Sequence, residues 1–597
     1  MDRNTFTGLF LILIVMAGSF YFMRPSEAEI LKEKERITAD SLQKVNGNKP
    51  VKAAPVVQKT VDTIKPTGPF ANHLTGSESI SVVENEKLKL SFTNKGGRIK
   101  SVQVKGEETY SGNPLILFDG NTNKFGFQLN IGGKVINTND LYFTSTPTES
   151  GVSLKAEYGP NQFIEFYYTL LKNSNNVDFK VSLNGMNGLI QGNQITFDWA
   201  STLLQQEKNV KKEQEHSAPY FKYVEENPDH LSTMSDEKIE LNEGKVEWLS
   251  FKQHFFSSII IPQIPFESGS IEVKTSIAPG QVKHYDAKML MPFNQLANQQ
   301  YDFKLYFGNN KFSDLKAQGH SIEKQIDLGY WPLKYINRFI VLPVFNFLDS
   351  FNWNYGLIIL VLTILLKVAM SPLTYKSYIS MAKMRILKPE MDEIKAKVGE
   401  DNPTLLQQEY LKLYKQVGVN PLGGCLPMLL QLPFVMAFFF FFPNLFEIRG
   451  ESFLWMKDLS TYDDFIKFGF EIPFIGDHIS LMCLLMTIST LIYTYFNNQI
   501  SGATGQMKYI GYIMPIIFLG VLNSYPSGLN YYYFLANMLT FLQQYLIRRM
   551  VNDDKIHAIL QENKTKPKTE KKKSKFQARL DEYMRMQQQQ QSQMKKK

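Results

Sequence analysis

The sequence predicts a multi-domain integral membrane protein with an N-terminal anchor helix, a large all-β domain and an all-α core of five transmembrane helices. Apolar windows gather at the start of the chain and after Tyr355, although charged residues make up 20% of its 597 residues. Between about residues 70 and 320, short runs of alternating polarity are separated by turn residues, a pattern typical of antiparallel strands. A chain of this length is also too long for one hydrophobic core.

Six apolar windows approach the roughly 17 to 25 residues that cross a bilayer as a helix. They cover residues 8–23, 355–373, 422–446, 479–496, 509–523 and 529–547. The first window could instead belong to a cleaved signal peptide, but its flank MDRN is weakly basic and AGSFYFMRP is a poor cleavage site. We therefore expect an anchor at residues 1–24, followed by a polar, proline-containing linker at 25–69.

The loops between the windows predict the orientation, because cytoplasmic loops collect Lys and Arg. Residues 374–420 hold eight basic residues, and the tail from Arg548 holds 15 basic against 6 acidic residues. Residues 447–478 are net acidic. This alternation predicts that both termini and the 374–420 insert are cytoplasmic, and that the β-domain lies on the opposite side of the membrane.

The region 70–320 is expected to be an antiparallel β-sandwich, with Gly96 and Gly97 in a hairpin turn. Further strands are predicted in GVSLKAEYG, QFIEFYYTLL, VDFKVSLNG, QITFDWA and SIEVKTSIAPG. Its histidines are scattered without metal-ligand spacing, and it has no Gly-rich phosphate loop. We expect no catalytic residue, metal or cofactor.

Two amphipathic segments flank the first core window. In residues 321–351, Trp331, Tyr335, Phe339 and Leu342 share one predicted helical face, and Lys334, Asn337 and Arg338 share another. This pattern suits a helix in the membrane interface, or a helix packed on the sandwich. Residues 374–420 carry two apolar stripes joined by VGEDNP, which predicts a cytoplasmic αα-hairpin. The stripes are Met381, Met384, Leu387, Met391 and Ile394, then Leu406, Tyr410, Leu413 and Val417.

Three segments resemble the signature blocks of the YidC/Oxa family of membrane protein insertases: SPLTYKSYISMAKMRILKPEM, VNPLGGCLPMLLQLPFVMAFFFF and YPSGLNYYYFLANMLTFLQQYLI. The order of domains is similar to the Gram-negative bacterial form. The resemblance implies a periplasmic β-supersandwich, an insertase core at residues 352–548 with a hydrophilic groove, and an inner-membrane location. It also implies nascent membrane proteins, the Sec translocon and membrane lipids as partners, and ribosomes bound through the hairpin and the basic tail at 549–597.

Five residues match groove or client-contacting positions of that family: Lys367, Thr363, Gln431, Tyr532 and Tyr533. The family has an arginine where this chain has Lys367, so the positive charge is kept but the bidentate guanidinium fork is lost. The spacing of four residues places Thr363 and Lys367 on one helix face. Two alternatives remain open: Lys367 can snorkel to the cytoplasmic interface, and the other polar residues can hold neighbouring helices together.

Two other classes of function are compatible with an ionisable residue in a membrane window. An ion-coupled transporter is disfavoured because none of the six windows contains Asp or Glu, and no internal repeat of the windows is evident. A membrane-anchored carbohydrate-active enzyme would need an acid and base pair that the pattern of the β-domain does not indicate. We therefore expect an insertase that is not an enzyme.

Overall fold

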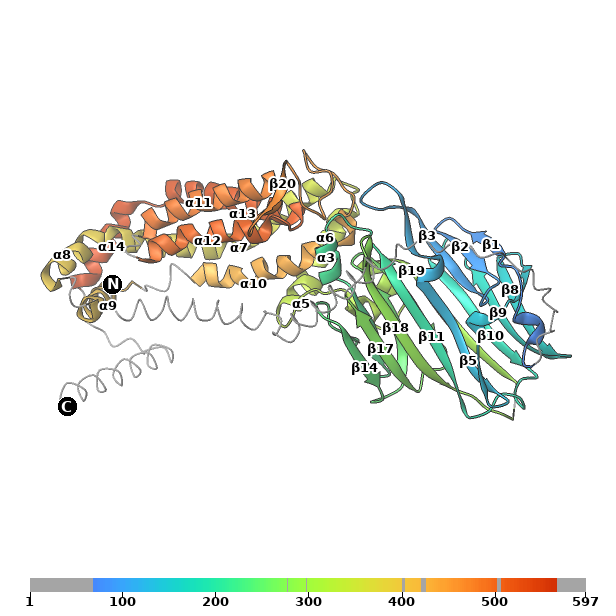
Figure 1. Ribbon diagram of the computed structural model, residues 1–597. Helices are drawn as coiled ribbons and strands as arrows, with labels where there is room; N and C mark the ends of the chain where they lie inside the picture. The colour runs from blue at the N-terminus through green and yellow to red at the C-terminus, as the bar shows by residue number, and fades with distance from the viewer. Residues whose placement is uncertain are drawn as a thin grey trace, which may run out of the picture. The chain divides into compact units, whose positions relative to one another are not determined.

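The computed structural model describes residues 68–275, 278–296, 298–399, 403–419, 426–501 and 506–565 (Figure 1). Three predicted segments fall wholly or mostly outside the described residues. They are the anchor at 1–24, nearly all of the linker at 25–69, and the tail after residue 565.

The described chain begins with an all-β domain in which the strand pairings are antiparallel. A four-stranded sheet has the order β1 (Ile80–Glu84), β2 (Leu88–Thr93), β3 (Arg98–Glu108), β4 (Pro114–Asp119). A nine-stranded sheet has the order β13 (Asp229–His230), β12 (Ala218–Tyr223), β15 (Val246–Lys252), β16 (Phe256–Pro262), β19 (Gln299–Asn309), β10 (Asn176–Asn184), β9 (Gln162–Leu170), β8 (Gly151–Gly159), β7 (Thr144–Pro147). A six-stranded sheet has the order β14 (Glu237–Leu241), β17 (Ser268–Lys274), β18 (Gln281–Pro292), β11 (Gln194–Leu204), β5 (Asn123–Ile131), β6 (Lys134–Asn137).

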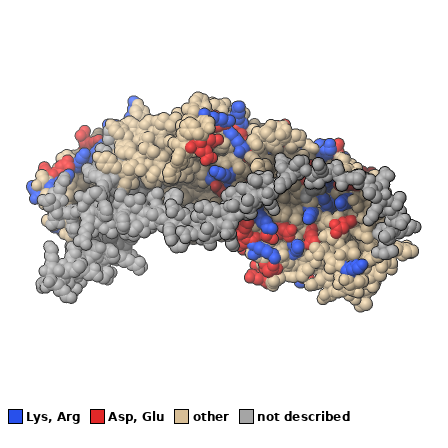
Figure 2. Space-filling model, viewed as in Figure 1, with Lys and Arg blue, Asp and Glu red and all other residues tan. Residues whose placement is uncertain are grey.

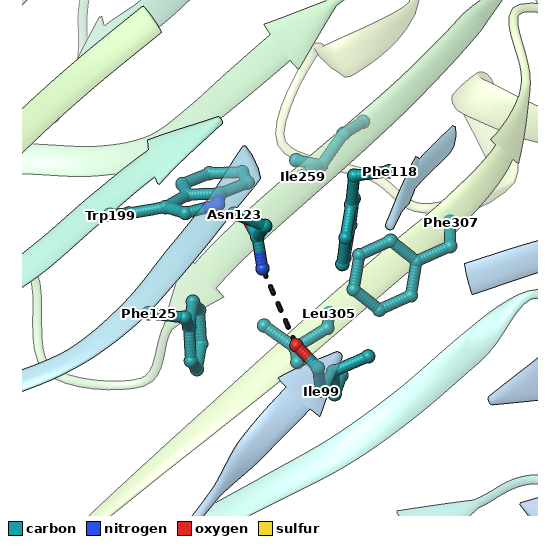
Figure 3. Close-up of a pocket in the computed structure, with 8 residues that line it drawn as sticks. All are labelled: Ile99, Phe118, Asn123, Phe125, Trp199, Ile259, Leu305 and Phe307. Atoms are coloured by element: carbon teal, nitrogen blue, oxygen red, sulfur yellow. Dashed lines mark hydrogen bonds between the residues drawn. The ribbon is translucent and has the colours of Figure 1, made fainter. Parts of the chain in front are cut away.

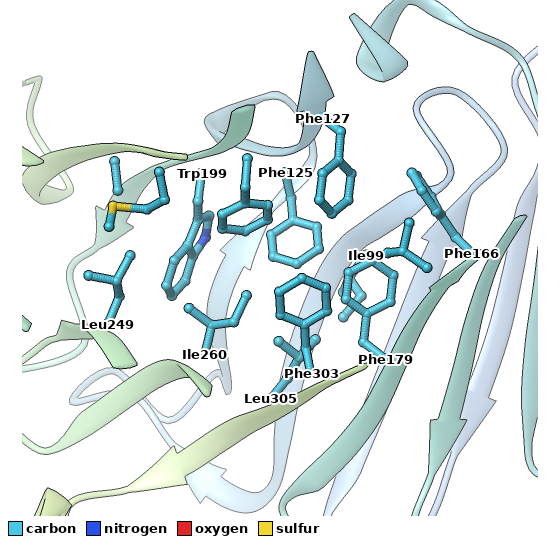
Figure 4. Close-up of a cluster of buried hydrophobic side chains, with 14 of the residues drawn as sticks. Ile99, Phe125, Phe127, Phe166, Phe179, Trp199, Leu249, Ile260, Phe303 and Leu305 are labelled. Atoms are coloured by element: carbon cyan, nitrogen blue, oxygen red, sulfur yellow. The ribbon is translucent and has the colours of Figure 1, made fainter. Parts of the chain in front are cut away.

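The two larger sheets pack together through an aromatic core (Figure 4). Phe127 of β5 faces Phe303 of β19 with ring centroids 6.3 Å apart, and Phe303 stacks on Phe179 of β10 at 5.4 Å. This packing follows from the period of two along each strand, which turns alternate side chains inward. The predicted turn is confirmed, because Gly96 and Gly97 both have positive φ and join β2 to β3.

A small cavity of about 10 Å³ remains inside this core (Figure 3). Aromatic and aliphatic side chains surround Asn123, whose Nδ2 donates to the carbonyl of Ile99 at 3.4 Å. A cavity of this size holds at most one water molecule and leaves no room for an organic ligand. The cavity is therefore a packing defect rather than a binding site.

The rest of the described chain is mainly helical. Short helices α4 (Phe312–Ala317), α5 (Leu333–Ile336) and α6 (Leu342–Asp349) precede the long ones, whereas α3 (Val210–Glu215) lies within the β-domain between β11 and β12. These are α7 (Tyr355–Ile386), α8 (Lys388–Val398), α9 (Pro403–Val417), α10 (Leu426–Phe441), α11 (Leu481–Ser501), α12 (Gln506–Leu522), α13 (Ser527–Met550) and α14 (Asp553–Thr565). A hairpin of β20 (Ile466–Ile472) and β21 (Gly476–Ile479) lies between α10 and α11.

Each apolar window after Tyr355 contains a helix: α7, α10, α11, α12 and α13. Among the described residues, α7 is the one helix that is long and apolar enough to cross a membrane by length and composition. It extends well beyond residue 373, where the apolar window ends, and continues through Pro372 to Ile386. Proline is tolerated inside membrane helices because neighbouring groups satisfy the freed carbonyl.

The predicted faces of the 321–351 segment are partly wrong. Trp331, Tyr335 and Phe339 are exposed, but Leu342 of the same predicted face is buried. Asn337 of the predicted polar face is buried as well. The Asn337 side chain donates to the carbonyls of Leu328 at 3.0 Å and Ala437 at 2.7 Å. The physical reason is a π-helical turn at Asn337–Val341, which shifts the helix faces away from the regular spacing used for the prediction.

The αα-hairpin is present as α8 and α9, and α14 packs against it. Leu387, Leu413 and Val417 from the predicted stripes are buried there together with Ile556 and Leu560 of α14. Lys564 Nζ lies 2.5 Å from Glu390 Oε1, which adds an ion pair between α14 and α8. The first part of the predicted tail at 549–597 is therefore a helix docked on the hairpin.

Candidate functional site

A band of polar side chains lies between α7, α11 and α13, within a bundle that is otherwise apolar. Lys367 of α7 donates from Nζ to Thr540 Oγ1 on α13 at 2.8 Å. Gln543, one turn further along α13, donates from Nε2 to the Lys367 carbonyl at 2.9 Å. The Lys367 ammonium is thus held by a neighbouring helix in this structure.

The band continues onto α11. Asn537 of α13 donates from Nδ2 to Ser489 Oγ and to Thr490 Oγ1, both at 2.9 Å. Three buried polar atoms of α11 and α13, Asn498 Nδ2, Asn530 Oδ1 and Gln543 Oε1, have no hydrogen-bond partner among the described residues. Buried polar groups are normally satisfied, so each of these atoms indicates a place where water or another polar group binds.

Thr363 lies one turn before Lys367 but in a different environment. Its side chain is buried, and Oγ1 donates to the carbonyl of Ile359 in its own helix at 2.6 Å. The spacing of four residues predicts that Thr363 and Lys367 share a helix face. The Thr363 hydroxyl, however, already has its hydrogen-bond acceptor within α7. The contacts of Thr363 belong to the packed part of the bundle.

The two predicted tyrosines join α13 to α10. The Tyr532 ring is buried with its centroid 4.2 Å from that of Phe438, and Tyr533 donates from its hydroxyl to the Val435 carbonyl at 2.9 Å. Gln431 lies on the same helix as Phe438 and is partly exposed. Both tyrosines therefore hold α13 and α10 together, as in the alternative in which these residues join neighbouring helices.

Thr540, Gln543 and Asn537 were not predicted as site residues. A signal for them was present, because Asn537, Thr540 and Gln543 recur every three residues in a mainly apolar window. Residues three and four apart share a helix face, so this stripe could have been recognised as a polar face turned toward α7 and α11.

A second group of charged residues is buried where the β-domain contacts the segment after α10. Arg449 donates from Nε to Glu207 Oε1 at 2.8 Å and from Nη2 to the Glu108 carbonyl at 2.7 Å. Burial raises the pKa of Glu207 to about 7, although Arg449 opposes the shift. Burial and the charge of Glu207 raise the pKa of Glu213 to about 8. The Glu213 carboxylate accepts from the backbone amides of Gln206 and Glu207, so this group is engaged in structural contacts.

Comparison with known proteins covers nearly the whole chain. The family described as "60Kd inner membrane protein" matches residues 347–555, and the family described as "YidC periplasmic domain" matches residues 81–346. The chain is 36% identical to the membrane protein insertase YidC of Parabacteroides distasonis, over 98% of each chain. It is 37% identical to that of Amoebophilus asiaticus, over 96% of this chain and 97% of the relative. With the YidC of Porphyromonas gingivalis it shares 34% identity over 100% of both.

Solved structures with similarity include a crystal structure of an active YidC insertase, at 19% identity and a TM-score of 0.32, over 79% of this chain and 93% of that one. A putative aldose 1-epimerase from Escherichia coli K12 gives 9% identity and a TM-score of 0.27, over 39% of this chain and 99% of that one.

Proposed function

Because the chain belongs to the YidC family of membrane protein insertases, we propose that it inserts newly made integral membrane proteins into the inner membrane and assists their folding. The observation that carries this proposal is the match to curated insertases along almost the full chain. The family consists of insertases rather than enzymes, so no catalytic residue is assigned. The all-β domain is the periplasmic domain of this family.

We propose a topology with an N-terminal anchor and five core spans, formed by α7, α10, α11, α12 and α13. The basic residues of the hairpin and the tail support a cytoplasmic position for both, and hence cytoplasmic termini. The proposed division of the chain is 1–24, 25–69, 70–320, 321–351, 352–548 with its hairpin at 374–420, and 549–597.

The proposed mechanism rests on the cost of moving polar groups through hydrocarbon. Each unsatisfied polar group in a bilayer core costs several kcal/mol, so a client's hydrophilic segment needs substitute partners while it crosses. The band contains the Lys367 ammonium group, the Thr540 hydroxyl that Lys367 contacts, and the unpaired Oε1 of Gln543. We propose that these groups and Gln431 line a hydrophilic groove, and that Thr363, Tyr532 and Tyr533, whose side chains make packing contacts within the bundle, form its wall. The client's apolar helix then moves into lipid.

The positive charge at Lys367 gives the groove a preference among clients. A single ammonium in a low-dielectric site attracts acidic segments, and a lysine suffices for this where no bidentate geometry is needed. Contacts with the Sec translocon, ribosomes and lipids are further proposals. The basic residues of the hairpin and tail support ribosome binding, which would weaken with salt as counter-ions are released from RNA.

The experiment that tests the function is depletion of the protein, followed by pulse-labelling of new membrane proteins and a protease-accessibility assay of their insertion. We expect some of these proteins to remain uninserted, and expression of the intact chain to restore them. A transporter would behave differently: its depletion would abolish uptake of a solute and leave insertion unchanged. Normal insertion of every labelled membrane protein after depletion would refute the proposal.

A further inference from the structure

A polar cleft of about 490 Å³ lies on the face of the six-stranded sheet that points away from the aromatic core. Its floor comes from β5, β11 and β18, which are neighbours in the sheet. Asp198 pairs with Gly126 and Lys288 in the sheet register, and Ala200 pairs with Lys124 and Asp286. These residues alternate with core side chains, so they face outward. Figure 2 shows acidic and basic side chains interspersed over this sheet.

One wall of the cleft is the short 3₁₀ helix η3 (Thr138–Asp140), and a second contains Lys95 and Arg98 from the β2–β3 turn region. The wall at η3 depends on Gly126 in the floor. A Cβ at this position would lie 2.6 Å from both Asn139 Nδ2 and Thr138 Oγ1. Glycine therefore allows η3 to lie directly over the sheet, which closes one side of the cleft.

Two side-chain oxygens of residues that line the cleft have no hydrogen-bond partner among the described residues. Asp198 Oδ2 accepts from Gln128 Nε2, but its Oδ1 is buried and accepts no hydrogen bond among the described residues. Asn139 Oδ1 is also buried and accepts no hydrogen bond among the described residues. Burial raises the pKa of Asp198, and Gln128 opposes the shift. Because buried acceptors are normally satisfied, these two oxygens indicate that water or another hydrogen-bond donor enters beside the cleft.

The charges that line the cleft are balanced. Glu78, Asp140, Asp198 and Asp286 are acidic, whereas Lys95, Arg98, Lys124 and Lys288 are basic. A balanced lining has no net potential to attract an anion or a cation. Its ligand must offer donors to the carboxylates and acceptors to the ammonium groups at closely spaced points. Hydroxyl groups do both.

We propose that this cleft binds a neutral, polyhydroxylated ligand of the size of a mono- or disaccharide. The volume lies within the roughly 300 to 1,000 Å³ typical of small-molecule sites. The proposal concerns binding in the periplasmic domain and goes beyond membrane protein insertion. No chemical conversion of the ligand is involved.

A peptide or an apolar ligand fits the cleft less well. Extended peptides bind at a sheet edge, where backbone groups are free, whereas this floor is formed by side chains of the inner strands β5, β11 and β18. Trp199 is the one aromatic residue among those that line the cleft in the described chain. Its ring stacks on Phe251 at 3.8 Å between centroids, within the core. The cleft therefore offers polar contacts rather than an apolar surface.

The test is a saturation-transfer NMR titration of the purified full-length protein in a detergent without a sugar head group, which would otherwise compete. The neutral probes are glucose, N-acetylglucosamine and maltose. Glucose 6-phosphate and glucosamine supply charged probes, and acetyl-Gly-Ser-Gly-amide supplies a peptide. The variants are Asp198→Asn and Lys124→Gln, with Asp178→Asn as the matched control. Asp178 is an exposed strand residue of the nine-stranded sheet, outside the cleft.

We expect at least one neutral sugar to bind saturably and more tightly than both charged analogues. Asp198→Asn should weaken that binding about tenfold, the scale of one lost charge-assisted hydrogen bond. Lys124→Gln should also weaken it, and this exposed residue can be changed without disturbing the fold. Asp178→Asn should bind like the wild type. The proposal is overturned if no neutral sugar saturates, if the peptide binds more tightly than the sugars, or if Asp198→Asn and Lys124→Gln both bind normally.

Discussion

The buried ion pair between Arg449 and Glu207 should be a strong contact between the β-domain and the segment that follows α10. The Arg449 side chain is 7% exposed and that of Glu207 is 11% exposed. Replacing Arg449 by Met leaves the Glu207 carboxylate buried without a cation. Breaking a buried pair in this way costs about 3 to 5 kcal/mol. For a domain of this size that corresponds to a fall in melting temperature of about 6 to 20 °C.

Thermal unfolding in detergent at pH 8, followed by tryptophan fluorescence, measures this effect. Glu207→Gln in the same chain should recover part of the loss, because it removes the unpaired charge. Lys412→Met is the control, since Lys412 is 69% exposed and its pair with Glu409 is worth about 0 to 1 kcal/mol. If Arg449→Met shifts the melting temperature no more than Lys412→Met does, the reasoning about this buried contact is refuted.

Three further predictions concern other parts of the chain. The pKa of Glu213 is raised from 4.5 to about 8, so between these pH values the folded state holds a proton that the unfolded chain releases. The free energy of unfolding should therefore fall as pH rises from about 5 to 8, by at most about 1.4 kcal/mol per pH unit. Melting curves of Glu213→Gln should show a smaller dependence on pH. Leu560→Asp should detach α14 and speed trypsin cleavage there, whereas Ile559→Asp, at an exposed position, should not; equal cleavage rates would contradict the docking of α14. Deleting residues 77–310 should leave insertion of a single-span client largely intact, and loss of that insertion with a stably folded bundle would show that the β-domain is required.

Much of the local structure follows from short-range patterns in the sequence. Alternation with period two located strands such as β8 and β9, and the apolar windows located α7 and α11 to α13. The order of strands within each sheet could not be derived, because β10 pairs with β19 across more than a hundred residues. Helix α14 was missed because its two buried residues, Ile556 and Leu560, stand among the charges of a basic tail.

The candidate site was only partly predictable, for similar reasons. Lys367 stands out because a charge within an apolar window is unusual. Its partner Thr540 lies 173 residues further along the chain, so their contact depends on how α7 packs against α13. The Arg449 contact joins residues 242 apart and left no local signal. The helix faces predicted for residues 321–351 were partly wrong because no sequence pattern predicts the π-helical turn before α7.

We infer that the charge of Lys367 acts on clients during insertion, and a charge series at this position distinguishes that role from a purely structural one. Lys367→Arg, Lys367→Ala and Lys367→Glu would be compared at matched expression, with Lys376→Glu as a control at an exposed position of α7. The clients would be two single-span proteins that differ only in an acidic or a neutral translocated tail. Loss of the Thr540 hydrogen bond alone is worth about 0.6 kcal/mol, too little to unfold the bundle.

We expect Lys367→Arg to insert both clients normally. Lys367→Glu should strongly impair the client with the acidic tail, Lys367→Ala should do so more mildly, and the client with the neutral tail should be spared. Lys376→Glu should insert both. Equal insertion of both clients by all three Lys367 variants would show that the charge does not act on clients. The Lys367 side chain would then only extend toward the cytoplasmic interface of the membrane.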